Sequence, residues 1–326
     1  MSPRRVTVCC PASAVTGGPE ALHQLVDALR TLGHDAHIAY YPFEGSFECP
    51  EPYRHYAAPQ GHLTDELGDL VIVPETATYL LLGIRNADVA VWWLSVDNYA
   101  GKVWRPEAVE LLAQTWRLVT RRKLPIWRMR GFCHFAQSQY AREFLSRSRI
   151  VAPLLSDYLG AEHLERCGTL LAGDSRRDIV AYNPRKGMDR TRRLREANPD
   201  ITFVPIQEMT NREVGHLLAT AKVYIDFGYH PGKDRLPREA AIAGCCVVTG
   251  RQGAANNAVD IPIPDEYKLC DATDAYIRTF TPLVQSIFAD FPGHASRFAA
   301  YRQAIIAEPD IFRSQVSAIF GDPCCT

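Results

Sequence analysis

Long apolar runs are missing from this 326-residue sequence. No stretch approaches the ~18 uncharged apolar residues that a membrane-spanning helix needs. The first segment reads Met-Ser-Pro-Arg-Arg and continues with a short apolar run over 6–10 that stops at Pro11. It lacks the longer apolar core and the small-residue cleavage site of a secretory signal. We therefore expect a cytoplasmic protein that at most lies against a membrane.

An excess of either charge is also missing. The 36 lysines and arginines oppose 37 aspartates and glutamates, so the formal net charge is −1. A chain with this balance has no overall attraction to nucleic acid, and we expect no nucleic-acid partner. Hydrophobic residues make up 47% and charged residues 22%, which is typical of a globular protein. The length fits two domains of roughly 150 residues each.

Metal-ligand spacing is the third absence. The ten cysteines include three adjacent pairs but no Cys-x-x-Cys, and adjacent cysteines rarely supply good chelate geometry. Histidine, aspartate and glutamate likewise show no cluster with the spacing of metal ligands. We therefore expect neither a metal nor another cofactor. Four cysteines fall in predicted buried strands, where a free thiol behaves as a small hydrophobe: Cys9, Cys10, Cys245 and Cys246.

What the sequence does contain is a regular alternation of short apolar runs with segments of helical period. It begins with a strand at 6–10, a loop of small residues, a helix over 21–32 and a strand at 34–40. A strand, a helix and a second strand in this order form a βαβ unit, which requires a parallel sheet. The first half continues with predicted strands at 69–74, 88–95, 132–137 and 150–155 and helices at 107–119 and 139–145.

The second half of the sequence repeats this pattern. Its predicted strands are 178–182, 201–205, 223–227 and 245–249, and its helices are 188–197, 211–221 (capped by Thr210 or Asn211) and 237–243, with further helices from 271 onward. Two successive α/β halves predict two Rossmann-like domains, at residues 1–160 and 170–305. A last helix within 306–326 would pack back on the first domain.

A glycine loop follows the first predicted strand. Gly17 and Gly18 lie at a turn from a strand to a helix, where the backbone can approach a ligand and the helix N-terminus offers N–H groups to an anion. The six-residue dinucleotide fingerprint with three glycines is absent. A simple tight turn and a ligand-binding loop therefore both fit this segment.

The stretch 224–250 is the richest in polar groups. A strand ends near Phe227, a loop leads into a short helix, and Gly244 ends that helix before another buried strand. Loops at the carboxyl ends of parallel strands are where α/β folds bind ligands. The side chains gathered within ten residues of this loop are His230, Lys233, Asp234, Arg235, Arg238 and Glu239.

The run Arg-Glu-Ala-Ala-Ile-Ala-Gly-Cys-Cys-Val-Val at 238–248 resembles the Glu-Ala-Met-Ala-x-Gly-x-Pro-Val-Val signature of GT-B glycosyltransferases, notably the family 4-like retaining enzymes. Segments in the same order along the chain are similar to other parts of that family: the early glycine loop, 135–141, 179–187 and 250–257. The resemblance implies two Rossmann-like domains whose parallel sheets face a central cleft. It implies transfer of a sugar, with a hexose expected, from a nucleotide-sugar donor.

The resemblance also implies roles for individual residues. Glu239 would hold the ribose hydroxyls of the nucleotide, and a carboxylate can accept both hydrogen bonds. Arg185 or Lys186 would meet the donor diphosphate, where a positive charge stabilises the leaving group. Lys233 and Arg238 are second candidates for that contact. The remaining implied positions are Gly17 and Gly18 in the N-terminal glycine loop and Asp97 facing the transferred sugar or the acceptor.

The sequence departs from the family pattern at one position. The family usually has a second glutamate eight positions before the one matched by Glu239, and Pro231 stands there. His230 or Asp234 would have to supply the missing sugar contact, so a retaining and an inverting outcome both stay open. Asp97 lacks the Asp-x-Asp partner of metal-dependent sugar transfer, which favours a metal-independent enzyme.

The family resemblance also implies the partners of the protein. We expect a nucleotide-sugar donor and a glycan or lipid-linked acceptor, in the biosynthesis of a surface polysaccharide. Basic residues at 121–123, 128 and 130 are interleaved with Trp116, Trp127, Met129 and Phe132. This patch fits either an ordinary solvated loop or peripheral contact with an anionic membrane. A nucleotide-sugar epimerase and a non-catalytic nucleotide-sugar-binding protein stay as alternative functions.

Overall fold

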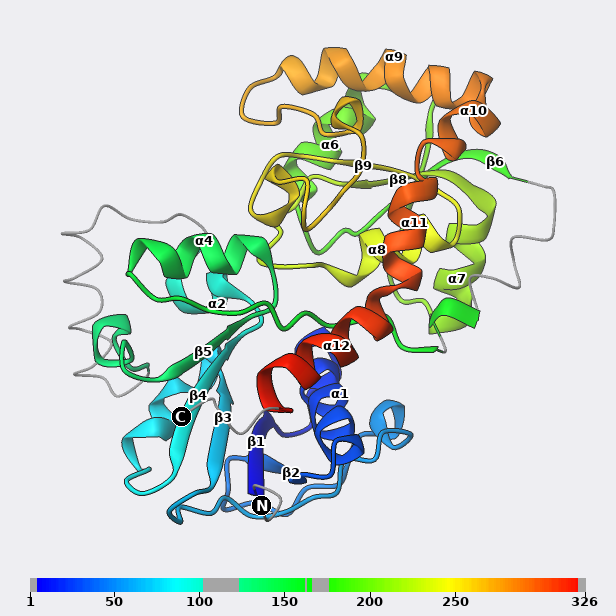
Figure 1. Cartoon of the computed structure of the whole chain (residues 1–326). Coiled ribbons are helices and arrows are strands. Elements are labelled where there is room, and N and C mark those ends of the chain that lie inside the picture. Colours follow the sequence, from blue (N-terminus) through cyan, green and yellow to red (C-terminus); the bar gives the residue numbers. More distant parts are fainter. Residues whose placement is uncertain (1–4, 102–122, 162, 166–175, 322–326) are drawn as a thin grey trace. The chain divides into compact units, whose positions relative to one another are not determined.

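The computed structural model describes residues 5–101, 123–161, 163–165 and 176–321, and it divides the chain into two compact units (Figure 1). The first unit comprises Met1–Asp157 together with Asp310–Thr326, and the second comprises Tyr158–Pro309. Each unit is an α/β structure with its own sheet, as the alternation of strand and helix patterns predicted. The limits predicted for the two domains, 1–160 and 170–305, and for the last helix, 306–326, stay a prediction.

The first unit is built on a five-stranded sheet in which every pairing is parallel. Its strand order is β2-β1-β3-β4-β5. All residues of β3 are buried, as expected for a central strand with both faces covered. The strands are β1 (Arg5–Pro11), β2 (Asp35–Tyr41), β3 (Leu70–Pro74), β4 (Asp88–Trp93) and β5 (Cys133–Ala136).

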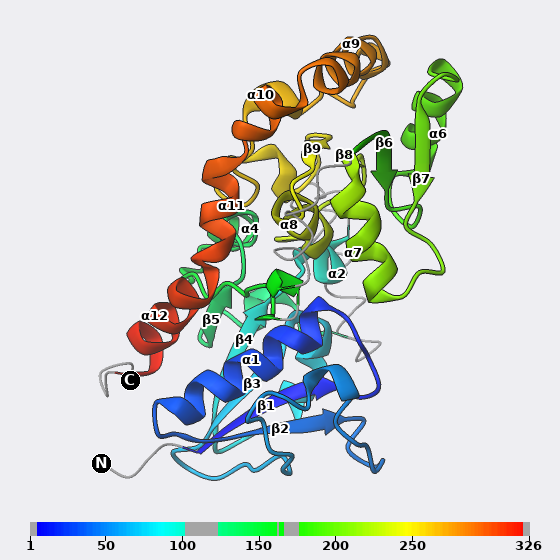
Figure 2. The same cartoon turned by 90° about the vertical axis from the view of Figure 1, so that its right-hand side faces the viewer.

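Helices on the first unit cover this sheet. Helix α1 (Gly17–Thr31) packs on β1 and β2 through its apolar stripe, which includes Leu22, Leu25 and Leu29 (Figure 2). The end of α12 (Glu308–Phe320) also belongs to this unit, where the Phe320 ring lies 5.4 Å from the ring of Phe135. The other helical segments are η1 (Glu51–Tyr53), η2 (Glu75–Leu82), α2 (Val96–Ala100), η3 (Ile126–Arg128) and α4 (Gln139–Arg147).

The second unit has a four-stranded parallel sheet in the order β7-β6-β8-β9. Helices α6 and α9 lie on one side of this sheet and α7 and α8 on the other (Figure 1). The strands are β6 (Arg177–Tyr182), β7 (Thr202–Pro205), β8 (Ala221–Asp226) and β9 (Cys246–Thr249). The helices are α6 (Met188–Ala197), α7 (Asn211–Thr220), α8 (Arg235–Ile242), α9 (Ala275–Ala289), α10 (Phe291–Ser296) and α11 (Ala299–Ile306), with the short turns η4 (Ala254–Asn256) and η5 (Asp265–Tyr267).

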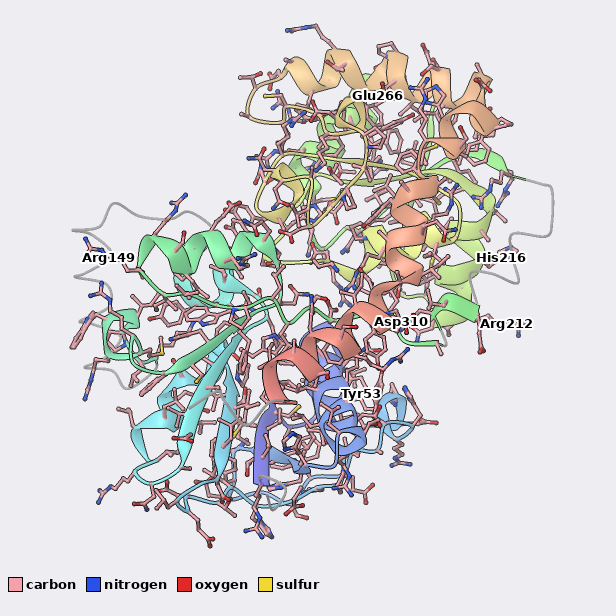
Figure 3. The ribbon with its side chains drawn as sticks, in the orientation of Figure 1. Tyr53, Arg149, Arg212, His216, Glu266 and Asp310 are labelled. Atoms are coloured by element: carbon pink, nitrogen blue, oxygen red, sulfur yellow. The ribbon has the colours of Figure 1, made fainter. Side chains whose placement is uncertain are left out.

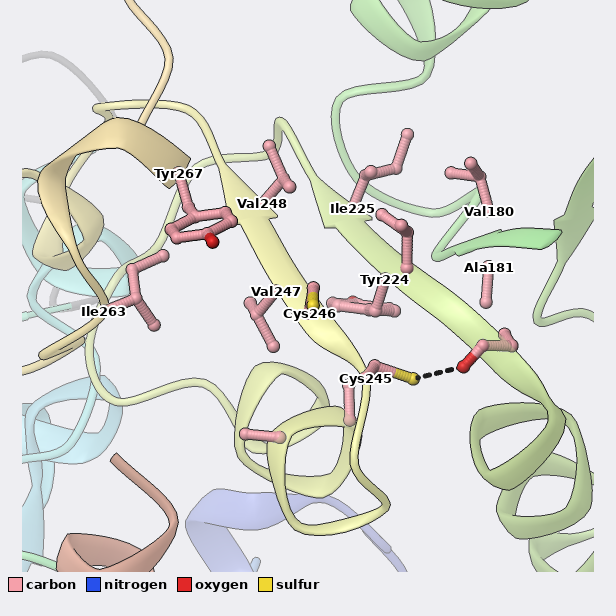
Figure 4. Close-up of a cluster of buried hydrophobic side chains, with 14 of the residues drawn as sticks. Val180, Ala181, Tyr224, Ile225, Cys245, Cys246, Val247, Val248, Ile263 and Tyr267 are labelled. Atoms are coloured by element: carbon pink, nitrogen blue, oxygen red, sulfur yellow. Dashed lines mark hydrogen bonds between the residues drawn. The ribbon is translucent and has the colours of Figure 1, made fainter. Parts of the chain in front are cut away.

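The core of the second unit gathers around β8 and β9 (Figure 4). Tyr224, Val247 and Cys246 are fully buried there, and the Cys245 thiol donates to the Leu218 carbonyl at 3.0 Å. Burial raises the pKa of the Cys246 thiol to about 12, and it does the same for Cys9 in β1. These cysteines therefore act as small hydrophobes, as the sequence predicted.

Several predicted elements need correction. Residues 150–155 do not form a strand, because Pro153 has no N–H to donate and Val151 is 93% exposed; only an isolated bridge joins Leu154 to Ala136. Strand β4 ends at Trp93, and the predicted strand residues after it lead into α2. The predicted helix 107–119 lies outside the described residues.

The basic and aromatic patch is smaller than predicted where the structure describes it. Met129 is fully buried in the first unit, whereas Trp127 is 44% exposed. Trp116 and the arginines at 121 and 122 lie outside the described residues. No described helix is long and apolar enough to cross a membrane.

Candidate functional site

The polar loops of the second unit meet at the carboxyl edge of its sheet. Strands β6, β8 and β9 run in the same direction and end at Tyr182, Asp226 and Thr249. The loops that follow these strands therefore start side by side, which is the usual ligand-binding position in a parallel sheet. Most of the predicted site residues lie in the first two of these loops or in α8.

A glycine contact locks the loop after β6 against the loop after β8. Gly187 has φ 59°, a left-handed conformation that glycine adopts without strain, and it precedes α6. A side chain there would overlap the backbone of Phe227 and Gly228. The side chain of Lys186 is in turn held close to Gly228. The two glycines thus let Lys186 reach across to the loop after β8.

Four charged side chains form a chain of contacts at this point. The Lys186 Nζ atom lies 2.7 Å from Oδ2 of Asp234, and Nδ1 of His230 lies 2.9 Å from the same oxygen. On the other side of the ring, Nε2 of His230 lies 3.6 Å from Oδ1 of Asp226. His230 is completely buried, and Lys186 keeps about a third of its side chain exposed. We call Asp226, His230, Asp234 and Lys186 the buried charge chain.

The pKa shifts of His230 and Asp234 both favour the charged form of the side chain. Burial alone lowers the pKa of His230, but Asp226 and Asp234 outweigh burial, so the net pKa lies above its ordinary value. Burial alone raises the pKa of Asp234, but His230 and Lys186 outweigh burial and bring the net pKa below its ordinary value. Opposite charges within a few ångströms produce shifts of this sign.

The same residues include a group that could hold a metal ion. One ligand atom each from Asp226, His230 and Asp234 lie within 4.8 Å of one another. This group was not predicted from the sequence, although its three residues are spaced four apart from the end of β8. The Lys186 ammonium already contacts Asp234, so a metal bound there would have to displace it.

Glu239 lies on α8 in a second ion-paired cluster. Its Oε1 is 2.9 Å from Nδ1 of His163 and 3.1 Å from Nε of Arg235, and the residue is 6% exposed. Burial alone raises the pKa of Glu239, but His163 and Arg235 outweigh burial and the net pKa is lowered. Glu239 is therefore a carboxylate at neutral pH. His163 comes from a helical turn far away in the sequence, and nothing in the sequence pattern identified it.

Lys233 and Arg238 form a third cluster with Glu308, the first residue of α12. The Lys233 Nζ atom lies 2.8 Å from one carboxylate oxygen of Glu308, and Nη1 of Arg238 lies 2.9 Å from the other. Arg238 is only 2% exposed, and it also donates to the Lys233 carbonyl at 3.1 Å. Arg185, in contrast, is exposed. Among the four predicted diphosphate ligands, Arg185 and Lys186 thus have the most accessible side chains.

The other predicted site residues lie in the first unit. Gly17 and Gly18 form the first turn of α1, after the carboxyl end of β1. The preceding carbonyl of Thr16 accepts a hydrogen bond from Tyr53, which Figure 3 labels, at 2.9 Å. Asp97 lies in α2 and accepts from the Tyr140 hydroxyl at 3.0 Å.

A buried glutamate of the first unit, Glu75, was not predicted from the sequence. Glu75 directly follows β3, is 1% exposed, and accepts a hydrogen bond from the Leu94 N–H at 2.9 Å. Burial raises the pKa of Glu75 to about 7, although the backbone hydrogen bonds oppose that shift. The position of Glu75 directly after an apolar strand could have identified it as a candidate site residue. Glu75 fixes the start of the loop that leads to Asp97.

Comparisons with known proteins address the fold. No family model matches the sequence, and no curated protein matches it. Solved structures match almost the whole chain at low identity. A sucrose-phosphate synthase from Thermosynechococcus elongatus is 12% identical, with 98% of each chain covered and a TM-score of 0.66. WaaG, a glycosyltransferase involved in lipopolysaccharide biosynthesis, is 10% identical, with 97% of this chain and 100% of that chain covered and a TM-score of 0.61.

A third match is the catalytic domain of starch synthase IV from Arabidopsis thaliana, solved with ADP and acarbose. It is 11% identical, with 97% of this chain and 100% of that chain covered and a TM-score of 0.54. These similarities confirm the fold expected from the motif at 238–248. The chain has the GT-B fold, with two α/β units whose sheets are parallel throughout.

Proposed function

We propose that this protein transfers a sugar from a nucleotide-sugar donor to a saccharide or related acceptor. The observation that carries the proposal is a buried carboxylate, Glu239, and a partly exposed ammonium, Lys186, in the second unit of a GT-B fold. These two groups match the two parts of a nucleotide that need opposite chemistry. The ribose offers hydroxyl donors to a carboxylate, and the diphosphate offers negative charge to a cation.

The proposed chemistry breaks the bond between the anomeric carbon and the diphosphate, and joins that carbon to an oxygen of the acceptor. Lys186, assisted by the exposed Arg185, would stabilise the charge on the departing diphosphate. Asp97, Gly17 and Gly18 would serve the acceptor and the transferred sugar from the first unit. His230 is completely buried, so in this proposal it supports the site and does not contact the sugar.

The similar structures support the class of substrates. The starch synthase structure holds ADP and acarbose, which are a nucleotide and a saccharide. WaaG is involved in lipopolysaccharide biosynthesis. We propose by analogy a nucleoside diphosphate sugar, with a hexose as the transferred group, and an acceptor that belongs to a surface polysaccharide or its lipid-linked precursor. Such an acceptor would favour peripheral membrane contact of a cytoplasmic protein.

A thermal-shift screen tests the donor site. UDP, GDP, ADP, CMP and TDP, each with its common sugars, are offered to the protein, and a ligand at ~100 times its dissociation constant adds roughly 2.7 kcal/mol of stability. We expect one nucleotide to raise the melting temperature, and Glu239→Gln to remove the rise. Glu266→Gln, a change at an exposed residue on η5, is the matched control (Figure 3). An unchanged affinity in Glu239→Gln would refute the role of Glu239.

A non-catalytic nucleotide-sugar-binding protein is the second candidate, and Pro231 favours it because a glutamate is usual at that position in the resembled family. Both candidates predict the same thermal shift. They differ in turnover. Release of nucleoside diphosphate from the bound donor, measured with a panel of saccharide and lipid-linked acceptors, supports the transferase, whereas stable donor binding with every acceptor supports the second candidate.

A further inference from the structure

We propose that Asp226, His230 and Asp234 are positioning residues that hold the Lys186 ammonium in place for the diphosphate of the donor. This inference rests on the proposed function, because it concerns the group that the second unit offers to a nucleotide. It assigns a purpose to His230, which the burial of its ring keeps away from any ligand.

The contact between Asp234 and Lys186 restricts the lysine side chain. Lysine side chains are flexible, and an exposed ammonium loses conformational freedom when it binds a ligand. The 2.7 Å contact with Asp234 removes much of that freedom before a ligand arrives. About a third of the Lys186 side chain is still exposed, so the fixed ammonium can contact a diphosphate as well. An ammonium has three donors and can bind both partners at once.

The contact between His230 and Asp234 in turn holds the carboxylate. The two cations, His230 and Lys186, approach the same oxygen of Asp234 from separate loop positions. Neither ring nitrogen of His230 makes a well-aligned hydrogen bond, and both are fully buried. The ring is therefore held mainly by charge. The His230 ring behind Asp234 holds that carboxylate against the Lys186 ammonium.

Asp226, at the inner end of the buried charge chain, is held in place by its own hydrogen bonds. Asp226 ends β8, accepts from the Gly228 N–H at 2.9 Å and from the Tyr224 hydroxyl at 3.3 Å, and faces the far side of the His230 ring. The backbone of His230 is held as well, since its carbonyl accepts from the Ala254 N–H at 2.8 Å. The histidine thus cannot shift without disturbing the loops after β8 and β9.

The signs of charge alternate along these residues. Acidic and basic side chains follow one another in the order Asp226, His230, Asp234 and Lys186. A diphosphate would extend the alternation by one more negative group. Because Lys186 already neutralises the outer carboxylate, the geometry favours an ammonium over a metal ion as the cation of this site.

The test compares affinity for a nucleoside diphosphate with affinity for the nucleoside that lacks the phosphates. UDP with uridine and ADP with adenosine are the probes, measured by calorimetry on the full chain. We expect His230→Asn and Asp234→Asn each to weaken diphosphate binding by about tenfold while nucleoside binding stays the same, because a charge-assisted contact is worth that much. Lys186→Ala should do the same, and Lys186→Arg should retain most of the affinity.

A double-mutant cycle makes the test specific. If His230 acts through Lys186, then His230→Asn has no further effect in the Lys186→Ala background. His216→Asn, on the exposed face of α7, is the matched control and should bind like the unchanged protein (Figure 3). Thermal unfolding of each variant shows whether it is folded. If His230→Asn is unfolded, the cycle is run with Asp234→Asn, because asparagine has nearly the same side-chain shape as aspartate.

Three results would overturn the inference. One is an equal loss of diphosphate and nucleoside affinity, which indicates a structural role only. Another is tighter diphosphate binding in Asp234→Asn, which means that Asp234 competes with the ligand. The third is a Mn²⁺-induced stabilisation that Asp226→Asn abolishes, which makes the cluster a metal site. If the unchanged protein binds neither diphosphate nor donor, the proposed function itself fails.

Discussion

The carboxyl edges of the two sheets hold buried carboxylates in opposite ways. In the first unit Glu75 is surrounded by backbone N–H groups, and its pKa is raised to about 7 by burial. In the second unit Glu239 is also buried and Asp234 is largely buried, but cationic side chains lower the pKa of both. Depth of burial therefore does not decide the charge of a carboxylate. The 2.9 Å contact of Glu239 with His163 and the 2.7 Å contact of Asp234 with Lys186 outweigh burial in the second unit, whereas burial prevails at Glu75.

The largest effect should come from breaking an ion pair of the second unit. Arg238→Met leaves Glu308 buried with one of its two cations removed, and we expect a loss of about 3–5 kcal/mol of stability. Urea denaturation with Arg212→Met as control measures it, since Arg212 is exposed on α7 (Figure 3). An equally small change in both variants would mean that Lys233 alone compensates Glu308.

A pH series compares the two kinds of carboxylate directly. The pKa of Glu75 is about 7 in the folded chain and close to 4.5 in the unfolded chain, so the stability contribution is complete below pH 4.5 and is lost as pH rises through 7. This loss amounts to about 3 kcal/mol. Glu75→Gln, which can still accept from Leu94, should stabilise the protein at pH 8 and have little effect at pH 4.5.

Glu239 should show the opposite sign. Its pKa is lowered, so its contribution is present above the unfolded value near 4.5 and is lost as pH falls through the folded value. Glu239→Gln should therefore destabilise the protein at pH 7 and matter less in acid. Thermal unfolding of both glutamine variants from pH 4 to pH 8 measures the contrast. If the melting temperatures of Glu75→Gln and Glu239→Gln changed with pH in the same direction, the two sheet edges would not hold their carboxylates in opposite ways.

The smallest effect concerns the helix caps of the two units. Thr210 caps α7 in a full capping box with Glu213, and Ser138 caps α4 through a hydrogen bond from Ala141 at 3.1 Å. We expect Thr210→Ala to cost about 1 kcal/mol, because one N–H of the first turn loses its acceptor. Ser138→Ala should cost more, since Ser138 is buried and water cannot replace the lost contact. The denaturation midpoints of the two variants test the order.

Most of the secondary structure was predictable because it depends on local patterns. The period of apolar residues gave the helix Met188–Ala197 at its observed limits and the four strands of the second sheet within two residues of theirs. Thr210 was one of two predicted caps, and it is the one that accepts the bond from Glu213. The prediction was wrong at 150–155, because an apolar composition does not supply the N–H groups that a strand ladder needs.

The candidate site was only partly predictable. His230, Asp234 and Lys186 were all named from the sequence, but the contact between Lys186 and Asp234 joins residues 48 positions apart. His163, Glu75 and Glu308 were missed because their partners Glu239, Leu94 and Arg238 are distant in the sequence. Asp226 was missed although its partner His230 is only four residues away. The roles assigned to Asp97, Arg185, Gly17 and Gly18 stay predictions.

The sequence by itself determined the alternation of strands and helices, the parallel sheets and the position of the polar loops, because side-chain periodicity and turn residues act over a few neighbours. Only the tertiary structure decided which charges face one another. Lys186 pairs with Asp234, and Arg238 pairs with Glu308, because the sheet and α12 bring distant segments within 3 Å. At that distance in a buried site, charge interactions are strong enough to set which carboxylates are ionised.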